Sequence, residues 1–245
     1  MQPRGDPAQG AELRERIRSK PALERWYRER YARFAHCVAR CPREGVILEL
    51  GSGGGFLAEC MPEVVTSDVV PYAGVDRVID AAHLPFGDGE LRAILMLNVF
   101  HHLPDVEALL AEAVRTLAPG GRMLISDQHL GWISTPILRY LHHEPCDPRA
   151  RSWRCAASGP LAGANGALAW IVFQRDRELF TRRFPQLRIA AYQPHSPLRY
   201  FLAGGLKSWS ALPGFAFPAA TALDRALGRL SPRWCSFVDV ELVRA

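Results

Sequence analysis

The sequence has no hydrophobic run long enough to cross a membrane. Its most apolar stretches, residues 161–173 and 212–223, are shorter than the roughly 18–20 residues that a membrane-spanning helix needs. Glycine, asparagine or proline also interrupts both stretches. Residues 1–10 are polar and lack the apolar segment of a secretory signal peptide. The sequence therefore predicts a cytoplasmic location.

Cysteine pairs at metal-binding spacing are also missing. The six cysteines form no CxxC pair. Cys37 and Cys41 would share one face of a helix, but no second cysteine or histidine pair follows at the spacing of a zinc site. We therefore expect buried free thiols and no bound metal.

Features of a nucleic-acid-binding protein are scarce. The sequence contains no internal repeat, no low-complexity tract and no separate module in which basic and aromatic residues alternate. Residues 1–45 hold 11 Arg or Lys residues against 6 Asp or Glu residues, which accounts for the whole net charge of +5. Their signs alternate, as on a solvated helix, so we expect a helical arm at residues 1–41 and no nucleic acid partner.

The arm has two expected helices, at 11–20 and 22–41, separated by Pro21. Apolar residues recur at helical spacing along the second helix and form one stripe, namely Leu23, Tyr27, Tyr31, Phe34 and Val38. This stripe either packs on the body of the domain or closes as a flap over a pocket, and the sequence leaves both interpretations open.

From residue 46 onward, short apolar strands alternate with helices. The expected strands are 46–50, 63–70, 75–80, 91–100, 122–127, 187–195 and 234–243. The clearest crossover helix spans 105–121, follows Pro104 and ends at Pro119-Gly120-Gly121. This alternation predicts an α/β fold with a Rossmann-like, doubly wound, mostly parallel sheet of about seven strands and helices on both faces. Residues 42–245 would form this single domain.

A glycine-rich turn follows the first expected strand. Glu49 lies within that strand, and Gly51, Gly53, Gly54 and Gly55 come directly after it. A strand, a glycine turn and a helix together form a cofactor cradle at the carboxyl edge of a parallel sheet. A dinucleotide loop needs a third small residue in this turn, and Phe56 occupies that position, which argues against a dinucleotide.

The complete set of motifs resembles the class I S-adenosylmethionine-dependent methyltransferases, most closely the branch called methyltransferase 11 or UbiE-like. Four further motifs follow the glycine loop in that family's order, within residues 46–127: Asp68, Asp80-Ala81 with Leu84-Pro85-Phe86, Val99-Phe100-His101-His102, and Leu117-Ala118-Pro119-Gly120-Gly121. The sequence departs from the family pattern before the fourth strand, where Leu91-Arg92 stands in place of Phe-Asp.

The resemblance implies that S-adenosylmethionine is the cofactor. Glu49 would hold its ammonium group, Asp68 its ribose hydroxyls, and Asp80 with the backbone near Ala81 its adenine. Asn98 would lie beside the methionine moiety. The remaining predicted cofactor-binding residues form the turn, namely Gly51, Ser52, Gly53 and Gly55. Two simpler roles stay open, because Asp68 could cap a strand and Asp80 could belong to a turn.

Two groups of residues are candidates for catalysis. His101 and His102 follow the fourth strand, where they either act on the acceptor or only shape its pocket. His142, His143 and Glu144, with Trp153 nearby, lie in the first of two late insertions, 131–170 and 197–232. We expect these insertions to form an acceptor pocket or a lid, although a structural Glu–His pair would also fit. The three consecutive residues are poorly spaced for a metal site.

The sequence therefore predicts a methyltransferase that acts on a small-molecule or lipid-like acceptor, at oxygen or carbon. The alternative is a non-catalytic S-adenosylmethionine-binding regulatory or partner protein with the same fold. Residues 197–223 are unusually apolar and include Arg199 and Lys207, so peripheral contact with a membrane surface stays open. The sequence fixes neither the acceptor nor the oligomeric state.

Overall fold

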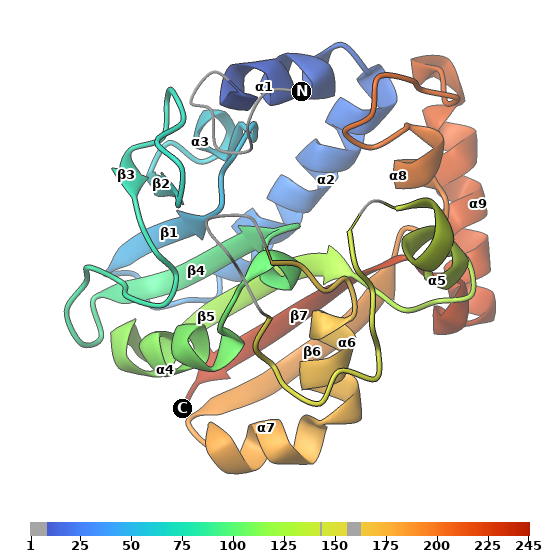
Figure 1. Cartoon of the computed structure of the whole chain (residues 1–245). Helices are drawn as coiled ribbons and strands as arrows, with labels where there is room; N and C mark the ends of the chain where they lie inside the picture. The colour runs from blue at the N-terminus through green and yellow to red at the C-terminus, as the bar shows by residue number, and fades with distance from the viewer. Residues whose placement is uncertain (1–8, 143, 156–162) are drawn as a thin grey trace.

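Seven strands form a single mixed sheet in the order β3-β2-β1-β4-β5-β7-β6 (Figure 1). The computed structural model describes residues 9–142, 144–155 and 163–245. The strands are β1 (Val46–Leu50), β2 (Val64–Asp68), β3 (Arg77–Val78), β4 (Leu91–Leu97), β5 (Leu117–Gln128), β6 (Leu187–His195) and β7 (Phe237–Arg244). All neighbouring pairs are parallel except the two that include β7. The predicted fold class is confirmed.

Helices cover both faces of this sheet. On one face lie α4 (Val106–Thr116), α6 (Leu168–Trp170), η3 (Ile171–Arg175) and α7 (Arg177–Arg183). On the other lie α1 (Gln9–Arg18), α2 (Pro21–Val38), α3 (Leu57–Cys60), α8 (Arg199–Leu202) and α9 (Phe217–Leu230). Short helices join the main elements: η1 (Phe100–His102), α5 (Ser134–Pro136), η2 (Ile137–Leu141), η4 (Gly214–Ala216) and η5 (Pro232–Trp234).

The central strands are apolar on both sides because each side meets a helical layer. Along β4, Ile94 and Met96 pack under α4, whereas Ala93 and Leu95 pack under α2. This explains why the strand reads as a continuous apolar run and not as an alternating one. The two hydrophobic clusters hold the sheet between them and fix the edge at which the parallel strands end.

The apolar stripe of the arm packs on the sheet. Leu23, Tyr27, Tyr31 and Phe34 of α2 are buried in the cluster on that face, and Pro21 occupies the first helical position, where proline is well tolerated. Both helices of the arm contact the glycine turn, because Gly54 lies against Leu13 of α1 and Gly55 lies against the Tyr31 hydroxyl of α2.

Several element boundaries differ from the predicted ones. The crossover helix α4 ends at Thr116, and Pro119-Gly120-Gly121 belongs to the beginning of β5. The third strand shortens to Arg77–Val78. The helical segment from Leu168 to Arg183 is divided into α6, a π-helical η3 and α7. A π-helical turn shifts the side chains that follow it, and no period in the sequence reveals that shift.

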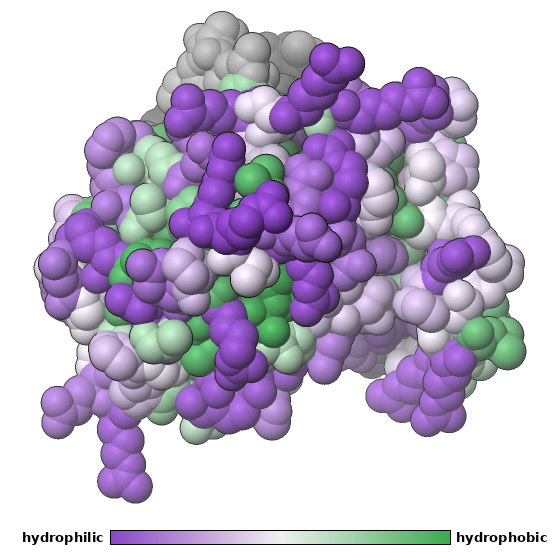
Figure 2. Space-filling view, turned by 90° about the horizontal axis from the view of Figure 1, so that it is seen from below, coloured by the Kyte–Doolittle hydropathy of each residue, from purple (hydrophilic) through white to green (hydrophobic). Residues whose placement is uncertain are grey.

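The surface on the α7 side of the molecule is mainly hydrophilic. Figure 2, which views the molecule from below relative to Figure 1, shows hydrophobic side chains only in small groups between hydrophilic ones. In the part of the chain that the structure describes, no helix combines the length and apolar character needed to traverse a bilayer. All six cysteines are free, and only Cys37 and Cys235 are buried, so the expectation of buried thiols holds for these two alone.

Candidate functional site

A cavity of about 560 Å³ opens at the carboxyl ends of β1, β2 and β4. The strand order reverses beside β1, because β2 lies on one side of it and β4 on the other. Ligands of doubly wound folds bind at such a switch point, and this volume lies within the usual range for small-molecule sites. All predicted cofactor-binding residues line this one cavity: Glu49, Gly51, Ser52, Gly53, Gly55, Asp68, Asp80, Ala81 and Asn98.

Glu49 is a buried carboxylate at the end of β1. Its side chain is only 3% exposed, and Oε2 accepts a hydrogen bond of 2.6 Å from the Ser52 hydroxyl. Burial, reinforced by the charge of Asp68, raises the pKa of Glu49 to about 7, although the Ser52 bond opposes this. A cationic ligand group beside Glu49 would therefore relieve an unfavourable burial.

Asp68 ends β2 and organises the glycine turn. Its Oδ2 atom accepts from the backbone N–H of Gly53 at 2.9 Å, and Oδ1 accepts from that of Val70 at 3.1 Å. Burial nevertheless raises the pKa of Asp68. Each carboxylate oxygen can accept a second hydrogen bond. Asp68 is thus both a structural acceptor and a group that can bind ligand hydroxyls.

The glycines of the turn serve different purposes. Gly51 has a φ of +72°, and a Cβ atom there would lie 2.3 Å from Cγ2 of Val99. A Cβ atom at Gly55 would lie 2.8 Å from both the Tyr31 hydroxyl and the Ser52 carbonyl oxygen. Only Gly53 has free space, because the nearest atom to its Cβ position is 3.9 Å away. Contacts within the protein therefore require glycine at 51 and 55.

Asp80 and Ala81 lie at the rim of the cavity. The Asp80 side chain is 57% exposed, and Oδ1 accepts from the backbone N–H of Ala82 at 2.9 Å. His83 approaches Oδ2 at 3.3 Å. Asp80 is therefore a turn residue that also lines the cavity, and its contact with the adenine of the cofactor stays a prediction.

Asn98 follows β4 in a strained conformation. Its φ of +56° lies in the left-handed region, which is uncommon for residues other than glycine. Its Oδ1 atom is buried and has no hydrogen-bond partner among the described residues. A buried acceptor without a partner is unfavourable unless a ligand donates to it.

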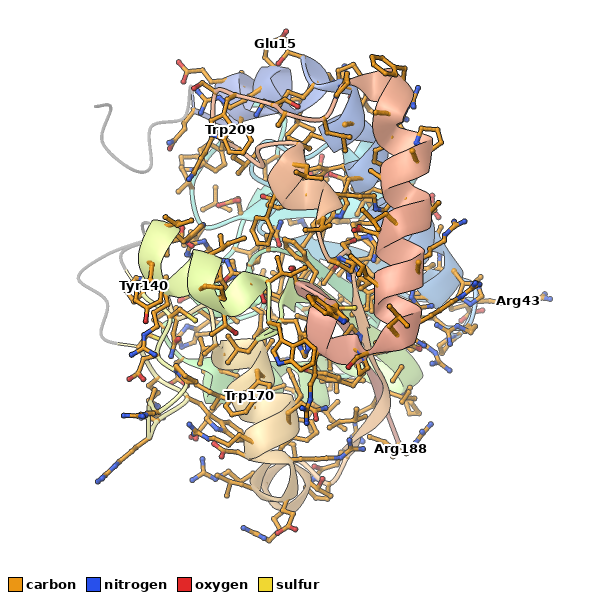
Figure 3. All side chains as sticks on the ribbon, turned by 90° about the vertical axis from the view of Figure 1, so that its right-hand side faces the viewer. Glu15, Arg43, Tyr140, Trp170, Arg188 and Trp209 are labelled. Carbon is orange, nitrogen blue, oxygen red and sulfur yellow. The ribbon has the colours of Figure 1, made fainter. Side chains whose placement is uncertain are left out.

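A second cavity of about 370 Å³ adjoins the first and shares Asn98, His102 and Leu206 with it. The two insertions meet here, because η2 lines one side and the segment from Tyr200 to Trp209 lines the other. Most of the wall is apolar, and His101, His102, His142 and Glu144 form its polar end. At the rim Trp209 is 50% exposed and Leu141 is 70% exposed, whereas Tyr140 projects outward from η2 (Figure 3).

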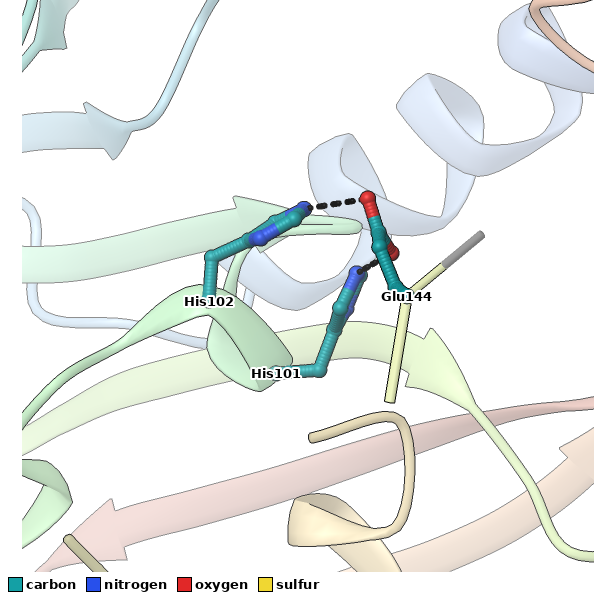
Figure 4. A group of neighbouring side chains, drawn as sticks. All are labelled: His101, His102 and Glu144. Carbon is teal, nitrogen blue, oxygen red and sulfur yellow. Dashed lines mark ion pairs between the residues drawn. The ribbon is translucent and has the colours of Figure 1, made fainter. Parts of the chain in front are cut away.

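The polar end of the second cavity is a cluster of two histidines and one glutamate (Figure 4). His101 and His102 project from η1 toward Glu144 of the first insertion. The Nε2 atom of His101 lies 3.3 Å from Oε2 of Glu144, and that of His102 lies 3.6 Å from Oε1. His142 also contacts Glu144, with 3.6 Å between Nδ1 and Oε2.

Asp127, which the sequence analysis missed, holds His101 from behind. Its Oδ1 atom lies 2.6 Å from Nδ1 of His101, and its Oδ2 atom accepts from the His101 backbone N–H at 3.2 Å. Asp127 is the penultimate residue of β5, which lies next to β4 in the sheet. Since neighbouring parallel strands end at one edge, the spacing of the fourth and fifth strands was the signal that could have found it.

The two histidines of the cluster have pKa values shifted in opposite directions. Burial opposes a charge on His101, but Asp127 and Glu144 together raise its pKa to about 10. Burial and the adjacent His101 lower the pKa of His102 to about 4. Glu144 is half-buried, yet the histidines lower its pKa to about 2. With these protonation states His101 donates to both carboxylates, and His102 stays neutral at pH 7.

The remaining residues named from the sequence lie outside this cluster or outside the described residues. His143 falls outside the described residues. Trp153 does not reach the acceptor cavity, because it is buried in the cluster on the α4 face and its indole N–H donates to Asp176 at 2.8 Å. Its apolar ring packs better in the core than at a wet pocket, so its position beside His142 in sequence was misleading.

The chain resembles known proteins in sequence. The model of a family described as methyltransferase domain matches residues 23–193. The ubiquinone/menaquinone biosynthesis C-methyltransferase UbiE of Desulfotalea psychrophila is 30% identical over 117 residues, 40% of this chain and 48% of that protein. The 27-O-demethylrifamycin SV methyltransferase of Amycolatopsis mediterranei is 38% identical over 56 residues, 21% of each chain. The chain thus spans less than half the length of these curated relatives.

The fold also resembles solved structures. Geranyl diphosphate C-methyltransferase from Streptomyces coelicolor A3(2) superimposes with a TM-score of 0.50 and 15% identity, over 91% of this chain and 82% of that one. At this identity the likeness concerns the fold alone. The matched family covers more than half of the 245 residues, including the glycine turn and the strands around it. The chain therefore belongs to the class I S-adenosylmethionine-dependent methyltransferases.

Proposed function

We propose that this protein transfers the methyl group of S-adenosylmethionine to an oxygen or carbon atom of a small, largely apolar acceptor. The observation that carries the proposal is the junction of the two cavities at Asn98, His102 and Leu206. One cavity carries the family's cofactor motifs, and the other is apolar with a polar end. Methyl transfer needs two ligands that meet at one point, and adjoining cavities meet that need.

The residues of the first cavity fit the cofactor. S-adenosylmethionine supplies a methyl group activated by its sulfonium centre. Glu49 would bind the ammonium group, which compensates its burial, and the partnerless Oδ1 atom of Asn98 would accept from the same end. Asp68 would accept from the ribose hydroxyls. Gly53, where a side chain would enter the cavity, leaves room for these contacts.

The second cavity suits an amphipathic acceptor. Ile137, Leu138 and Phe201 supply apolar walls, and the histidine–glutamate cluster faces the polar end. Two curated relatives are named for transfer to carbon of a quinone precursor and to oxygen of a rifamycin, which supports either kind of acceptor atom. The apolar rim at Leu141 and Trp209 would admit a lipid-like molecule. His102, the uncharged imidazole of the cluster, would accept the proton of an acceptor hydroxyl or carbon acid.

Two variants test the roles of the cavities separately. Asp68→Ala should abolish binding of S-adenosylhomocysteine in calorimetry, because it removes an acceptor and loosens the turn at Gly53. Ile137→Trp should fill the second cavity, preserve cofactor affinity and reduce methyl transfer at least tenfold. The matched control is Ile133→Trp, at a half-buried residue that lines neither cavity.

To identify the acceptor, the protein is incubated with radiolabelled S-adenosylmethionine and fractionated lipid and small-molecule extracts, and each fraction is measured for label. We expect label in one fraction with the wild type and its loss with Ile137→Trp. Cofactor binding without labelling of any fraction would point to a non-catalytic binding protein. Absence of cofactor binding to the folded chain would refute the proposal.

A further inference from the structure

We propose that His101, His102 and Glu144 bind a divalent transition-metal ion of the zinc class at the polar end of the second cavity. Three potential ligand atoms, from two segments that are distant in the sequence, come within 4.8 Å of one another. Spacing along the sequence argues against a metal, because His142, His143 and Glu144 are consecutive. In the fold, η1 lies against Glu144, so the potential ligands are His101, His102 and Glu144 and not three consecutive residues.

The distances between donor atoms suit a small tetrahedral ion. With metal–ligand bonds of about 2.1 Å, neighbouring ligands of a tetrahedral site lie about 3.4 Å apart. The Nε2 atoms of His101 and His102 lie 3.3 and 3.6 Å from the two oxygens of Glu144. The three ligand atoms span at most 4.8 Å, so the widest pair has to approach by up to about 1.4 Å to bind one ion.

Asp127 prepares His101 as a ligand. It contacts the Nδ1 atom at 2.6 Å, which leaves Nε2 facing Glu144 and the cavity. A carboxylate behind a metal-binding histidine fixes its tautomer and makes it a better donor. Asp127 is itself fixed, because Oδ1 also accepts from the backbone N–H of Gln128 at 2.6 Å. The ligand therefore cannot turn away without breaking two buried contacts.

The composition of the cluster selects the class of ion. Two imidazoles and one carboxylate suit zinc, cobalt or nickel, whereas magnesium and calcium prefer oxygen ligands. Two carboxylates, Asp127 and Glu144, lie close to His101. A divalent ion would replace the Nε2 proton of His101, and its two positive charges would balance the two carboxylates.

Three protein ligands leave a coordination position open toward the cavity, as in catalytic zinc sites. If the proposed methyl transfer is correct, an acceptor hydroxyl would take this position and lose its proton to water more readily, or a carbonyl oxygen would take it and make the adjacent C–H group more acidic. This extension rests on the proposed function. Metal binding itself does not, and it is tested without cofactor or acceptor.

The test is titration of the metal-free 245-residue chain with Zn²⁺ by calorimetry, and with Co²⁺ by visible absorption. We expect one tight site per chain, an intense cobalt band typical of tetrahedral coordination and no thiolate charge-transfer band from the free cysteines. His102→Ala and Glu144→Gln should weaken binding at least tenfold, and Asp127→Asn should weaken it by about 10–100-fold. Mg²⁺ should not compete.

His36→Ala is the matched control, because this histidine lies exposed on α2 far along the sequence from the cluster. It should leave the metal affinity unchanged, and circular dichroism should show that every variant is folded. Equal affinity of the wild type and the folded Glu144→Gln variant would overturn the proposal, as would the absence of a tight site. S-adenosylhomocysteine binding, measured separately, reports on the proposed function alone.

Discussion

Glu49 and Asp68 are two buried carboxylates that line one cavity, and each is satisfied in a different way. Asp68 accepts two backbone hydrogen bonds, whereas Glu49 accepts a single hydroxyl. This difference explains why burial raises the pKa of Glu49 as far as about 7. The acid with fewer internal partners is the one that responds most to a ligand and to pH.

Cofactor binding should therefore depend on pH through Glu49. The free protein holds Glu49 protonated below about pH 7, whereas the ammonium group of the cofactor favours the carboxylate. Affinity should fall as the pH decreases below 7, and binding near pH 6 should release up to about one proton. Calorimetry of S-adenosylmethionine binding in buffers of different ionisation enthalpy measures this release.

Glu49→Gln provides the comparison for this pH effect. The amide keeps the size of the side chain and cannot titrate, so proton release should disappear and the remaining affinity should vary little between pH 6 and 8. Proton release that persists in Glu49→Gln would assign the effect to another group.

Gly51 and Gly53 should respond differently to alanine. Gly51→Ala combines left-handed strain with overlap on Val99 and should lower the free energy of unfolding by about 2–4 kcal/mol. Gly53→Ala has the strain but not the overlap, and should cost about 1 kcal/mol. Urea denaturation of both variants measures the difference.

Val99→Ala tests the physical cause. It removes the two methyl groups that lie 2.3 and 2.8 Å from the added Cβ, so it should recover part of the loss in Gly51→Ala and none in Gly53→Ala. A double-mutant cycle that shows no coupling between residues 51 and 99 would contradict the packing explanation.

Among the elements, α2 and β7 share a buried row of charges. Asp239 of β7 lies 3.2 Å from Arg30 and 3.0 Å from His195. Glu241, two residues further along the same face, pairs with Arg33 and Arg40. Asp239 and Glu241, alternate residues of β7, are thus acidic, and arginines from α2, from the segment after it and from β5 pair with them.

Asp239→Asn should be strongly destabilising, because it leaves buried cationic partners without an anion. We expect a loss of about 3–5 kcal/mol in the free energy of unfolding. The control is Glu178→Gln on α7, whose carboxylate faces Arg182 with an exposed fraction of 94% and should change stability by less than about 0.5 kcal/mol. Urea denaturation measures the free energy of unfolding of both variants. Similar losses in the two would contradict a special role for the buried row.

The helix α1 should move more than α2 and respond to the cofactor. Only Gly10 and Ile17 of α1 are buried, whereas α2 buries eight residues. Leu13 and Ile17 line the cofactor cavity. Hydrogen exchange should be faster in α1 than in α2 and should slow in α1 when S-adenosylhomocysteine is added. If the exchange rate in α1 does not change when the ligand is added, α1 does not cover the bound cofactor.

Across the whole molecule, the elements that could be predicted from the sequence are those with a regular pattern of apolar residues. The exact limits of the first strand follow from the apolar run 46–50, and the buried face of α2 follows from its apolar stripe. The end of α4 at Thr116 was not predictable from the glycines, because pairing with β4 begins at Leu117 and ends the helix earlier. Tertiary pairing overrode a local stop signal there.

The cofactor residues follow a local motif, so the sequence places them near one another, although their roles stay predictions. The second cavity does not follow a local motif. His101 meets Glu144 across 43 positions in the chain, and this contact depends on the path of an insertion without regular period. Asp127 was missed for a different reason, because it contacts His101 from the neighbouring strand β5 and only the shared edge of the two strands points to it.

The position of β7 has a consequence for synthesis. This strand follows all others in the sequence, yet it lies between β5 and β6. While a ribosome is still producing residues 196–236, β1 to β5 can already pair, but β6 has no neighbour in the sheet. Two open edges therefore persist until the last strand emerges and closes both at once, and nascent chains stalled at that stage should be the most prone to aggregate.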